Sequence, residues 1–292
     1  MEHREEIRFV GMQDAEYPPL LHQTHDPPPG LYLRGAPLVL AFPVAIVGTR
    51  RMTSYGARAT ERLVTGLVRA GCEIISGLAL GIDGAAHDAA LKAGGKTVAV
   101  LGGGCDPACV YPREHAGLAE RIVAAGGTLV SEWPAGTKSR KHHFLMRNRI
   151  IAGLSLATVV IEAPERSGAL VTARLAAEEN REVFVVPGPI TQVQSRGTNN
   201  FLKFGAAPCT DASDVLHCLG LEEADSVTAT ANVTADERAL LDALTEERHA
   251  DDLCRALACK PQVLSAIVTS LELKGFIERI GGDRYVRAAS FR

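Results

Sequence analysis

The sequence predicts an α/β protein with a Rossmann-like, doubly wound parallel sheet and a small C-terminal winged-helix domain. From residue 44 onward, short apolar runs alternate with amphipathic stretches. Strands that lack polar alternation are buried on both faces, as in a parallel sheet covered by helices. Glycine is frequent, with 28 residues, and aromatic residues make up only 5%, which suits a core of small aliphatic side chains and tight strand-to-helix turns.

Each element follows from this alternation. Strands are predicted at Val44–Val47, Ile74–Ser76, Thr97–Leu101, Thr128–Ser131, Ala157–Ile161 and Val183–Val186. Helices are predicted between them, near 55–70, 84–93, 114–125, 147–154 and 168–180. Gly71, Gly94-Gly95 and Gly126-Gly127 each follow a predicted helix. They are expected to end these helices in a left-handed conformation.

The chain is predicted to have four segments. Residues 1–43 are rich in proline, which fixes φ and removes hydrogen-bond donors, so we expect a lead-in that packs over the core domain rather than building a core. Residues 44–220 form the Rossmann-like domain, and 221–233 form a linker. Residues 234–292 begin with a capping box at Thr234 and Glu237. Three helical patterns and two short strands follow, which is the outline of a winged helix.

Composition favours a protein of the reducing cytoplasm. The seven cysteines are odd in number and mostly isolated, and they are not spaced as metal ligands. Residues 1–20 contain no apolar core of a signal peptide, and no apolar run approaches the roughly 20 residues of a membrane span. We therefore expect a cytoplasmic location, no membrane contact and no metal. The formal net charge of −3 argues weakly against a general polyanion-binding protein, but the positions of the cations decide that question.

Open parallel sheets bind ligands beyond the carboxyl ends of their strands, so the loops that follow the strands are candidate sites. The loop Gly48-Thr49-Arg50-Arg51 follows the first predicted strand. Its glycine permits close approach of the backbone, and Arg50 suits bidentate phosphate contact or stacking on a base. A tight turn with two solvated arginines is the alternative, and this loop alone does not decide between them.

A second candidate is the basic stretch from Trp133 to Ile151. No acidic residue lies between Glu132 and Glu162. The stretch contains five cations, Lys138, Arg140, Lys141, Arg147 and Arg149. Cations that follow phosphates and a ring such as Phe144 that stacks on an unpaired base are typical of single-strand binding, and Asn148 is placed to contact a base edge or to cap a helix. The alternative is a solvated basic loop that leads into a helix.

Two further loops argue against an enzyme. Ser76–Gly84 departs from the spacing of a dinucleotide fingerprint. Asp83 and His87 are four residues apart and could resemble a catalytic pair, but a helix N-cap and a residue of the helix face are the favoured interpretation. Ser167 is expected to cap a helix whose first amides, at Gly168 and beyond, are free for an anion. The sequence contains no evident nucleophile–base pair and no ATP-binding loop. We therefore expect no catalytic activity and no cofactor.

At this point the motifs together resemble the DprA/Smf family of DNA-processing proteins. The resemblance covers about residues 17–219 in order, and it is specific because the motifs occur as a series. The motifs are Val44–Arg50, Ser76–His87, Val98–Asp106, Tyr111-Pro112, Ser131-Glu132, Phe144–Gly153, Ser167–Ala173, Val186–Ile190 and Gly197–Ala206. Leu145 stands where the family usually has proline, and no proline stands at Lys138.

The resemblance implies a single-stranded DNA-binding protein of natural transformation and recombination. Such a protein protects incoming DNA, helps to load the RecA recombinase and forms a homodimer. By motif position, Arg50, Lys141 and Phe144 would line the DNA pocket, with Arg147-Asn148-Arg149 and Ser167-Gly168 beside them. With the loop residues above, the predicted nucleic-acid-binding set is Gly48, Thr49, Arg50, Lys141, Phe144, Arg147, Asn148, Arg149, Ser167 and Gly168.

Two other functions are weighed against this one. The first is a nucleotide-metabolising, phosphoribohydrolase-like enzyme. Such enzymes resemble a Pro-Gly-Gly-x-Gly-Thr-x-x-Glu pattern, whereas Glu165–Thr172 has neither the paired glycines nor the glutamate. The second is a winged-helix transcription regulator. The predicted recognition helix after Pro261 is poor in arginine and lysine, which argues against duplex recognition.

Overall fold

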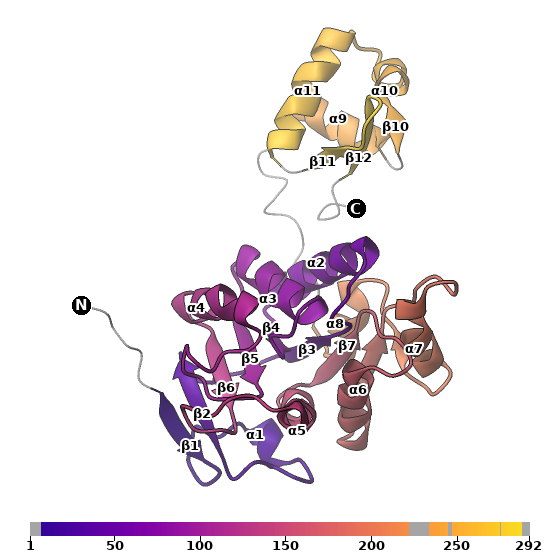
Figure 1. Ribbon diagram of the computed structural model, residues 1–292. Coiled ribbons are helices and arrows are strands. Elements are labelled where there is room, and N and C mark those ends of the chain that lie inside the picture. The colour runs from indigo at the N-terminus through magenta and orange to yellow at the C-terminus, as the bar shows by residue number, and fades with distance from the viewer. Residues whose placement is uncertain (1–6, 222–233, 245–246, 275, 288–292) are drawn as a thin grey trace, which may run out of the picture. The chain divides into compact units, whose positions relative to one another are not determined.

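The structure is a computed structural model that describes residues 7–221, 234–244, 247–274 and 276–287. The chain divides into two compact units, Met1–Glu223 and Ala224–Arg292, and each is described by itself (Figure 1). The predicted linker at 221–233 lies outside the described residues, apart from Leu221.

The first unit is built on one mixed sheet. Within the described residues its strands are arranged in the order β1-β2-β6-β5-β4-β3-β7-β8-β9. From β6 to β9 in this order, neighbouring strands are parallel, whereas β1–β2 and β2–β6 pair antiparallel. The strands are β1 Arg8–Gly11, β2 Gly30–Gly35, β3 Pro43–Val47, β4 Glu73–Ser76, β5 Thr97–Leu101, β6 Thr128–Ser131, β7 Ala157–Val160, β8 Glu182–Val185 and β9 Ala207–Pro208.

Helices cover both faces of this sheet (Figure 1). The helices are α1 Pro19–His22, α2 Ser54–Arg69, α3 Ile82–Lys92, α4 Ala116–Ala124 after the short 3₁₀ helix η1 Arg113–His115, α5 Lys141–Gly153, α6 Gly168–Glu178, α7 Val193–Leu202 and α8 Ala212–Cys218. Alternate residues of β3 enter different cores. Ala45 and Val47 pack with α1, α5 and α6, and Val44 and Ile46 pack with α2, α3 and α8. This two-sided burial explains the continuous apolar runs and confirms the doubly wound class.

The predicted turn glycines behave as expected. Gly71, Gly94 and Gly126 have φ angles of +90°, +73° and +79°, in the region that costs glycine least. Each follows a helix and precedes a strand of the sheet. The prediction that these positions end the helices in a left-handed conformation is confirmed.

The prediction that residues 1–43 wrap over the core without building it is wrong. β1 and β2 extend the sheet beyond β6, and Leu21, Leu31 and Leu33 are completely or almost completely buried. Tyr17 is also buried, and its hydroxyl donates to the Pro28 carbonyl oxygen. Five of the seven prolines lie in connections between elements, Pro19 begins α1 and Pro43 is the first residue of β3, so none interrupts a strand.

Helix boundaries near the candidate site also differ from the predictions. α5 begins at Lys141, earlier than the predicted 147. The sequence did not reveal this start, because the N-cap position has no side chain that caps the helix. Asp83 is not an N-cap. Gly81 holds that position with φ +79°, and Asp83 lies in the first turn of α3. The elements α7, β9 and α8 are additional to those predicted.

The second unit has the predicted winged-helix architecture. Its elements are α9 Ala235–Ala243, β10 Arg248–His249, α10 Ala250–Ala256, α11 Pro261–Leu273, β11 Ile277–Arg279 and β12 Arg284–Arg287. The strands form an antiparallel sheet in the order β10-β12-β11. The Thr234–Glu237 capping box is present.

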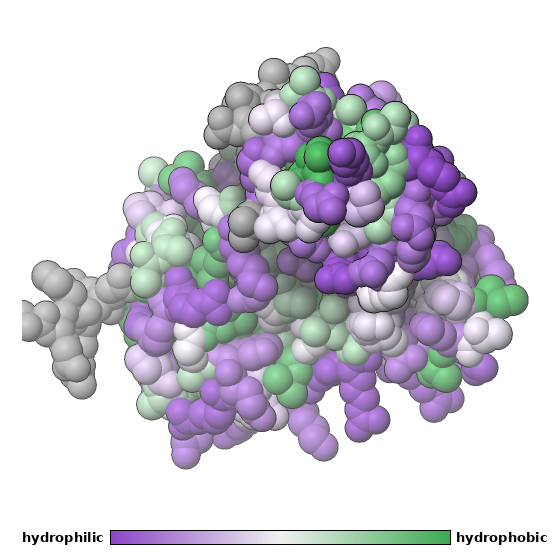
Figure 2. All heavy atoms as spheres, turned by 90° about the horizontal axis from the view of Figure 1, so that it is seen from above, coloured by the Kyte–Doolittle hydropathy of each residue, from purple (hydrophilic) through white to green (hydrophobic). Residues whose placement is uncertain are grey.

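The surface in view in Figure 2 is largely hydrophilic, with hydrophobic side chains in small groups.

Candidate nucleic-acid interface

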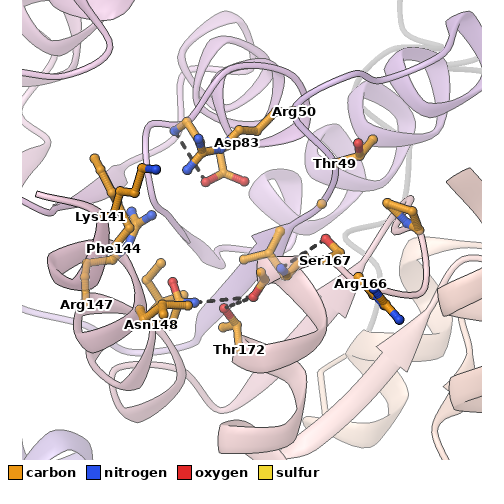
Figure 3. A pocket seen from close by; sticks show the side chains of 18 of the residues that line it. Thr49, Arg50, Asp83, Lys141, Phe144, Arg147, Asn148, Arg166, Ser167 and Thr172 are labelled. Atoms are coloured by element: carbon orange, nitrogen blue, oxygen red, sulfur yellow. Dashed lines mark hydrogen bonds between the residues drawn. The ribbon is translucent and has the colours of Figure 1, made fainter.

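A pocket of about 610 Å³ lies at the carboxyl ends of β3, β4 and β7 (Figure 3). From β3 the chain proceeds through β4, β5 and β6 toward one edge of the sheet, and from β7 through β8 and β9 toward the other. The pocket therefore lies at the switch point of strand order, where open α/β sheets bind ligands. Its lining residues are Val47, Gly48, Thr49, Arg50, Ala79, Asp83, Tyr111, Lys141, Phe144, Leu145, Arg147, Asn148, Ile151, Pro164, Arg166, Ser167, Gly168, Ala169 and Thr172.

The loop after β3 is hydrogen-bonded to the segments that lie next to it. Thr49 N donates to the Glu162 carbonyl oxygen at 2.7 Å, so the loop is hydrogen-bonded to the end of β7. The buried Glu162 carboxylate accepts from Thr53 N at 2.9 Å and from Thr53 Oγ1 at 2.6 Å. These bonds join the loop to the N-cap of α2, so hydrogen bonds hold the backbone on both sides of Arg50.

Two glycines allow this loop to approach α3 closely. A Cβ atom at Gly48 would lie 2.5 Å from Ile82 Cγ1, and one at Gly81 would lie 2.3 Å from the Thr49 carbonyl oxygen. Because both distances are shorter than real contacts, any side chain at either position would displace the loop. The close approach predicted for Gly48 is therefore present, although it serves the packing of the loop on α3.

Arg50, Lys141 and Phe144 come together on one side of the pocket, as the sequence predicted (Figure 3). The Arg50 guanidinium lies over the Phe144 ring, with Cζ 5.6 Å from the ring centroid. Lys141 is exposed at the first position of α5. A cation at a helix N-terminus opposes the helix dipole, and within the described residues neither Arg50 nor Lys141 forms an ion pair. The arrangement is suited to an anionic ligand that would neutralise both charges.

Arg147 lines the floor of the pocket, where it is bound to the fold. Its Nη1 donates to the carbonyl oxygens of Gly77, at 2.5 Å, and Val100, at 2.6 Å. Burial lowers the pKa of Arg147 to about 10, although the charge of Asp83 opposes the shift. Burial likewise raises the pKa of Asp83, against the charge of Arg147 and hydrogen bonds from the backbone amides of Gly77 and Ala79. These contacts connect the end of β4 with β5 and with the start of α3.

The opposite side of the pocket is the N-terminus of α6. Ser167 caps this helix by accepting from Ala169 N at 3.2 Å, as predicted. Asn148 Nδ2 donates to the Gly168 carbonyl oxygen at 3.3 Å. Asn148 thus links α5 to α6, and the positive end of the α6 dipole lies at the pocket.

Arg149 is the predicted site residue that the structure does not bring to the pocket. Its guanidinium pairs with Glu132 at 2.8 Å and with Asp26 at 2.9 Å. Residues two positions apart on a helix lie on different faces, so Arg147 and Arg149 cannot both face the pocket. Helical spacing was the available signal, since both residues lie in the predicted helix 147–154, but it was not applied to them.

The structure adds Tyr111, Arg166 and Asp83 to the residues of the site. Tyr111, in the loop after β5, is 51% exposed and lines the pocket. Arg166 is an exposed cation beside Ser167. Arg166 stood next to a predicted site residue, and Tyr111 lay in a quoted motif, but neither was selected because each is an isolated polar or aromatic residue in its own loop.

The charge of the pocket is strongly asymmetric. Its lining cations are Arg50, Lys141, Arg147 and Arg166, and Asp83 is the acid among the lining residues.

In the part of the chain that the structure describes, no cluster of histidine, cysteine, aspartate or glutamate could hold a metal ion. Among the same residues, no helix has the length and apolar character needed to cross a membrane. The lining of the pocket itself combines positive charge and aromatic side chains, although the net charge of the chain is negative.

Comparison with known proteins gives the family. The family model described as DNA recombination-mediator protein A matches residues 8–220, and the DprA winged helix domain matches 224–283. The chain is 45% identical over 208 residues to Protein Smf of Escherichia coli, a match that covers 70% of this chain and 55% of that protein. It thus spans about half the length of that relative. It is 43% identical to DNA processing protein DprA of Streptococcus pneumoniae, over 70% of this chain and 71% of that protein.

Solved structures agree with the sequence relatives. The X-ray structure of DprA from Streptococcus pneumoniae has a TM-score of 0.68 and 40% identity, and the match covers 73% of this chain and 74% of that one. DNA processing protein A from Helicobacter pylori, described for its single-stranded DNA binding mode, has a TM-score of 0.65 and 30% identity, with coverage of 74% and 97%. With the matched models, these likenesses show that this chain belongs to the DNA recombination-mediator protein A family, the DprA/Smf proteins.

Proposed function

We propose that this chain binds single-stranded DNA in the pocket at the carboxyl ends of β3, β4 and β7. One observation carries the proposal: Arg50, Lys141 and Phe144, which lie far apart in the sequence, converge on one side of that pocket. The similar protein of Helicobacter pylori is described as binding single-stranded DNA, which supports the same ligand here.

A single strand fits this pocket better than a duplex does. Aromatic rings at the pocket can contact a base face only when that base is unstacked. The cations around them can follow a phosphate backbone, and affinity that depends on phosphate contacts tolerates any sequence. We therefore expect binding that depends on strandedness and salt and only slightly on base sequence.

The wider role that we propose is DNA processing in natural transformation and recombination. In this role the chain protects incoming strands and helps to load the RecA recombinase, as a cytoplasmic homodimer. Its similarity to DNA processing proteins of Bacillus subtilis, at 40% identity, and of Streptococcus pneumoniae supports this role. RecA assembly on single-stranded DNA coated with a single-strand-binding protein tests the loading. We expect the wild-type chain to shorten the lag of assembly, and an unchanged lag would contradict the loading role.

We further propose that the chain is a binding protein rather than an enzyme. The alternative is a phosphoribohydrolase-like activity, which needs a carboxylate that can reach a glycosidic bond. The acid among the lining residues, Asp83, is buried and accepts backbone hydrogen bonds. Incubation with nucleoside monophosphates, followed by chromatography of free base, tests this point. Steady release of base that is lost in Asp83→Asn would favour the enzyme.

A winged-helix transcription regulator is the other alternative. Its recognition helix would be α11, Pro261–Leu273, which contains neither arginine nor lysine. Recognition helices ordinarily use such residues for phosphates and base edges. We expect duplex DNA to compete poorly with oligo-dT for the protein.

The central experiment removes two of the unpaired pocket charges together. Fluorescence anisotropy with labelled oligo-dT measures the Kd of wild type and of Arg50→Ala/Lys141→Ala. Because phosphate contacts dominate affinity, we expect the Kd of the double variant to rise about a hundredfold at low salt. The matched control is Arg58→Ala/Arg174→Ala, which removes two exposed arginines outside the pocket lining. An equal loss in both double variants would overturn the assignment of the site.

A further inference from the structure

The winged-helix unit contains two cysteines, Cys254 and Cys259, whose thiols are neighbours. Both pack against the hydrophobic core of this unit, and each remains partly exposed to solvent. Burial raises the pKa of the Cys254 thiol, and the charge of the Cys259 thiol and a hydrogen bond with it raise that pKa further. The other five cysteines are either buried or exposed: Cys72, Cys105, Cys109 and Cys209 are buried, and Cys218 is exposed.

A turn at the end of α10 brings the two residues together. Cys259 N donates to the Cys254 carbonyl oxygen at 3.1 Å. One step inward, Ala258 N donates to the Arg255 carbonyl oxygen at 3.3 Å, and Ala258 has a φ of +48°. These two bonds and the left-handed residue define a Schellman motif, in which the side chains of the first and the sixth residue commonly contact each other. Cys254 and Cys259 occupy those two positions.

The geometry of the pair fits a disulfide bond. Such a bond needs Cα atoms about 4.4–6.8 Å apart and side chains that point toward each other. With standard bond lengths, the hydrogen bond between Cys259 N and Cys254 O keeps the two Cα atoms less than about 7 Å apart even if the linked atoms were collinear. The bends at these atoms shorten the distance further. The interaction between the thiols shows that the side chains point toward each other.

The turn that these cysteines span connects α10 to α11. Cys259 directly precedes Lys260, the N-cap of α11, and Pro261 is the first residue of that helix. Ala258 adopts the left-handed conformation that is unfavourable for a residue with a Cβ atom. Because the turn depends on this unfavourable conformation, a covalent bond between its ends would restrict the opening of the helix pair.

We propose that Cys254 and Cys259 form a dithiol that low-molecular-weight disulfides such as oxidised glutathione convert to an intramolecular disulfide, and that this disulfide locks the turn between α10 and α11. In the first step, one cysteine thiolate attacks the small disulfide, forms a mixed disulfide and releases one small thiol. In the second step, the other cysteine attacks the protein sulfur of the mixed disulfide and releases the second small thiol. The two cysteines lose two electrons and two protons, and the small disulfide takes up both.

Tryptic mapping of the full chain tests whether the bond forms. Trypsin cleaves after Arg255 but not after Lys260, which proline follows, so the two cysteines fall in separate peptides, 249–255 and 256–274. The chain is equilibrated with oxidised glutathione at a concentration that modifies the exposed Cys218, and the remaining thiols are alkylated. We expect mass spectrometry to find the two peptides joined, at two hydrogens below the sum of their masses, and dithiothreitol to separate them.

Matched variants distinguish the pair from a single thiol. Cys218→Ser should keep the joined peptides, because it removes a cysteine outside the pair. Cys254→Ser should lose them and carry a glutathione adduct at Cys259. The proposal is overturned if Cys254 and Cys259 of wild type remain thiols, or carry separate adducts, under conditions that modify Cys218.

Hydrogen exchange measures the effect on the turn. The disulfide closes a loop of six residues, 254–259, and the entropy that it removes from the open state predicts that opening becomes about tenfold rarer or more. Amides of 250–274 in the full chain should therefore exchange about tenfold more slowly after oxidation. Cys254→Ser/Cys259→Ser should exchange equally under both conditions. Equal exchange in reduced and crosslinked wild type would contradict the locking of the turn.

Discussion

The pocket and the winged-helix unit both carry clusters of cations, but the clusters differ in what surrounds them. Among the described residues, Arg50, Lys141 and Arg166 at the pocket form no ion pair, although the charge of Arg50 acts on the buried Asp83. In the winged-helix unit five of the cations are paired with acids of the same unit. The pairs are Arg279–Asp283, Arg284–Glu247, Arg287–Asp242, Arg255–Asp252 and Lys274–Glu237.

The difference shows that the number of cations is a poor guide to polyanion binding. An arginine whose charge is already neutralised by a neighbouring carboxylate gains little from a phosphate, because the ion pair must first be broken. An unpaired cation at a ligand-binding edge contributes its full field. This is why a chain with net charge −3 can present a strongly positive pocket.

The largest effect is expected from Arg147, the pocket cation that differs from its neighbours by being buried. Arg147→Leu leaves the Gly77 and Val100 carbonyl oxygens without their donor and Asp83 without its compensating charge. We expect the free energy of unfolding to fall by about 3–5 kcal/mol. Urea denaturation measures it. Arg174→Leu, an exposed change on α6, should stay within about 0.5 kcal/mol of wild type. Equal stability of the two variants would contradict the structural role of Arg147 and would group it with the exposed cations of the pocket.

The next effect concerns salt. For single strands, log K changes by about 0.7 per phosphate contact for each unit of log salt concentration. Arg50→Ala/Lys141→Ala should therefore make the salt dependence of oligo-dT binding shallower by about 1.4 in this slope. The matched winged-helix variant, Arg279→Ala/Arg284→Ala, should leave the slope unchanged. A shallower slope in the winged-helix variant would remove the contrast between the two regions.

A smaller effect, confined to the winged-helix unit, is expected on acidification. The Glu237 carboxylate accepts from Lys274 Nζ at 2.7 Å, Ser270 Oγ at 2.6 Å and Thr234 N at 2.7 Å. These bonds lower its pKa from 4.5 to about 2, with that from Lys274 contributing most. Because the pKa is lower when folded, the stabilisation is present above pH 4.5 and is lost as pH falls toward 2.

Hydrogen exchange of peptides from 234–287 in the full chain can follow this loss. Protection in wild type should decline from pH 5 to pH 3 relative to Glu237→Gln, which lacks the ionisable group and should already be less protected at pH 7. A constant difference between the two proteins across this range would contradict the assignment.

The smallest effect is expected from Arg149. Its charge is already paired with Glu132 and Asp26, away from the pocket lining. Arg149→Ala should change the Kd for oligo-dT less than twofold, although the loss of partly exposed ion pairs should cost about 1 kcal/mol of stability. Anisotropy and urea denaturation measure the two quantities. A large loss of affinity with unchanged stability would return Arg149 to the site.

Much of the first unit could be predicted because its signals are local. Apolar runs mark the parallel strands, and the glycines that end the helices lie where their φ angles require them. The antiparallel extension β1–β2 could not be predicted in this way. Its strand residues Leu31 and Leu33 become core only because β6 offers a free edge, and that edge exists only in the assembled sheet.

The site divides in the same manner. Arg50, Lys141 and Phe144 were predicted together through motif order, and Ser167 was predicted from its position before a helix. Tyr111 was not predicted as a site residue, because its importance comes from its distance to Phe144. Arg149 was included because its charge matched the cluster, but it lies outside the pocket lining and pairs with Asp26 and Glu132.

By itself, the sequence determined the α/β class, the positions of the main strands along the chain and the family motifs. Each of these depends on residues that are neighbours in the chain or one helical turn apart. Only the tertiary structure decided which cations remain unpaired, which ring is open and which arginine serves the fold. Those properties depend on partners distant in sequence, such as Glu132 for Arg149 or Gly77 for Arg147. Packing selects these partners, and an isolated segment of chain carries no record of them.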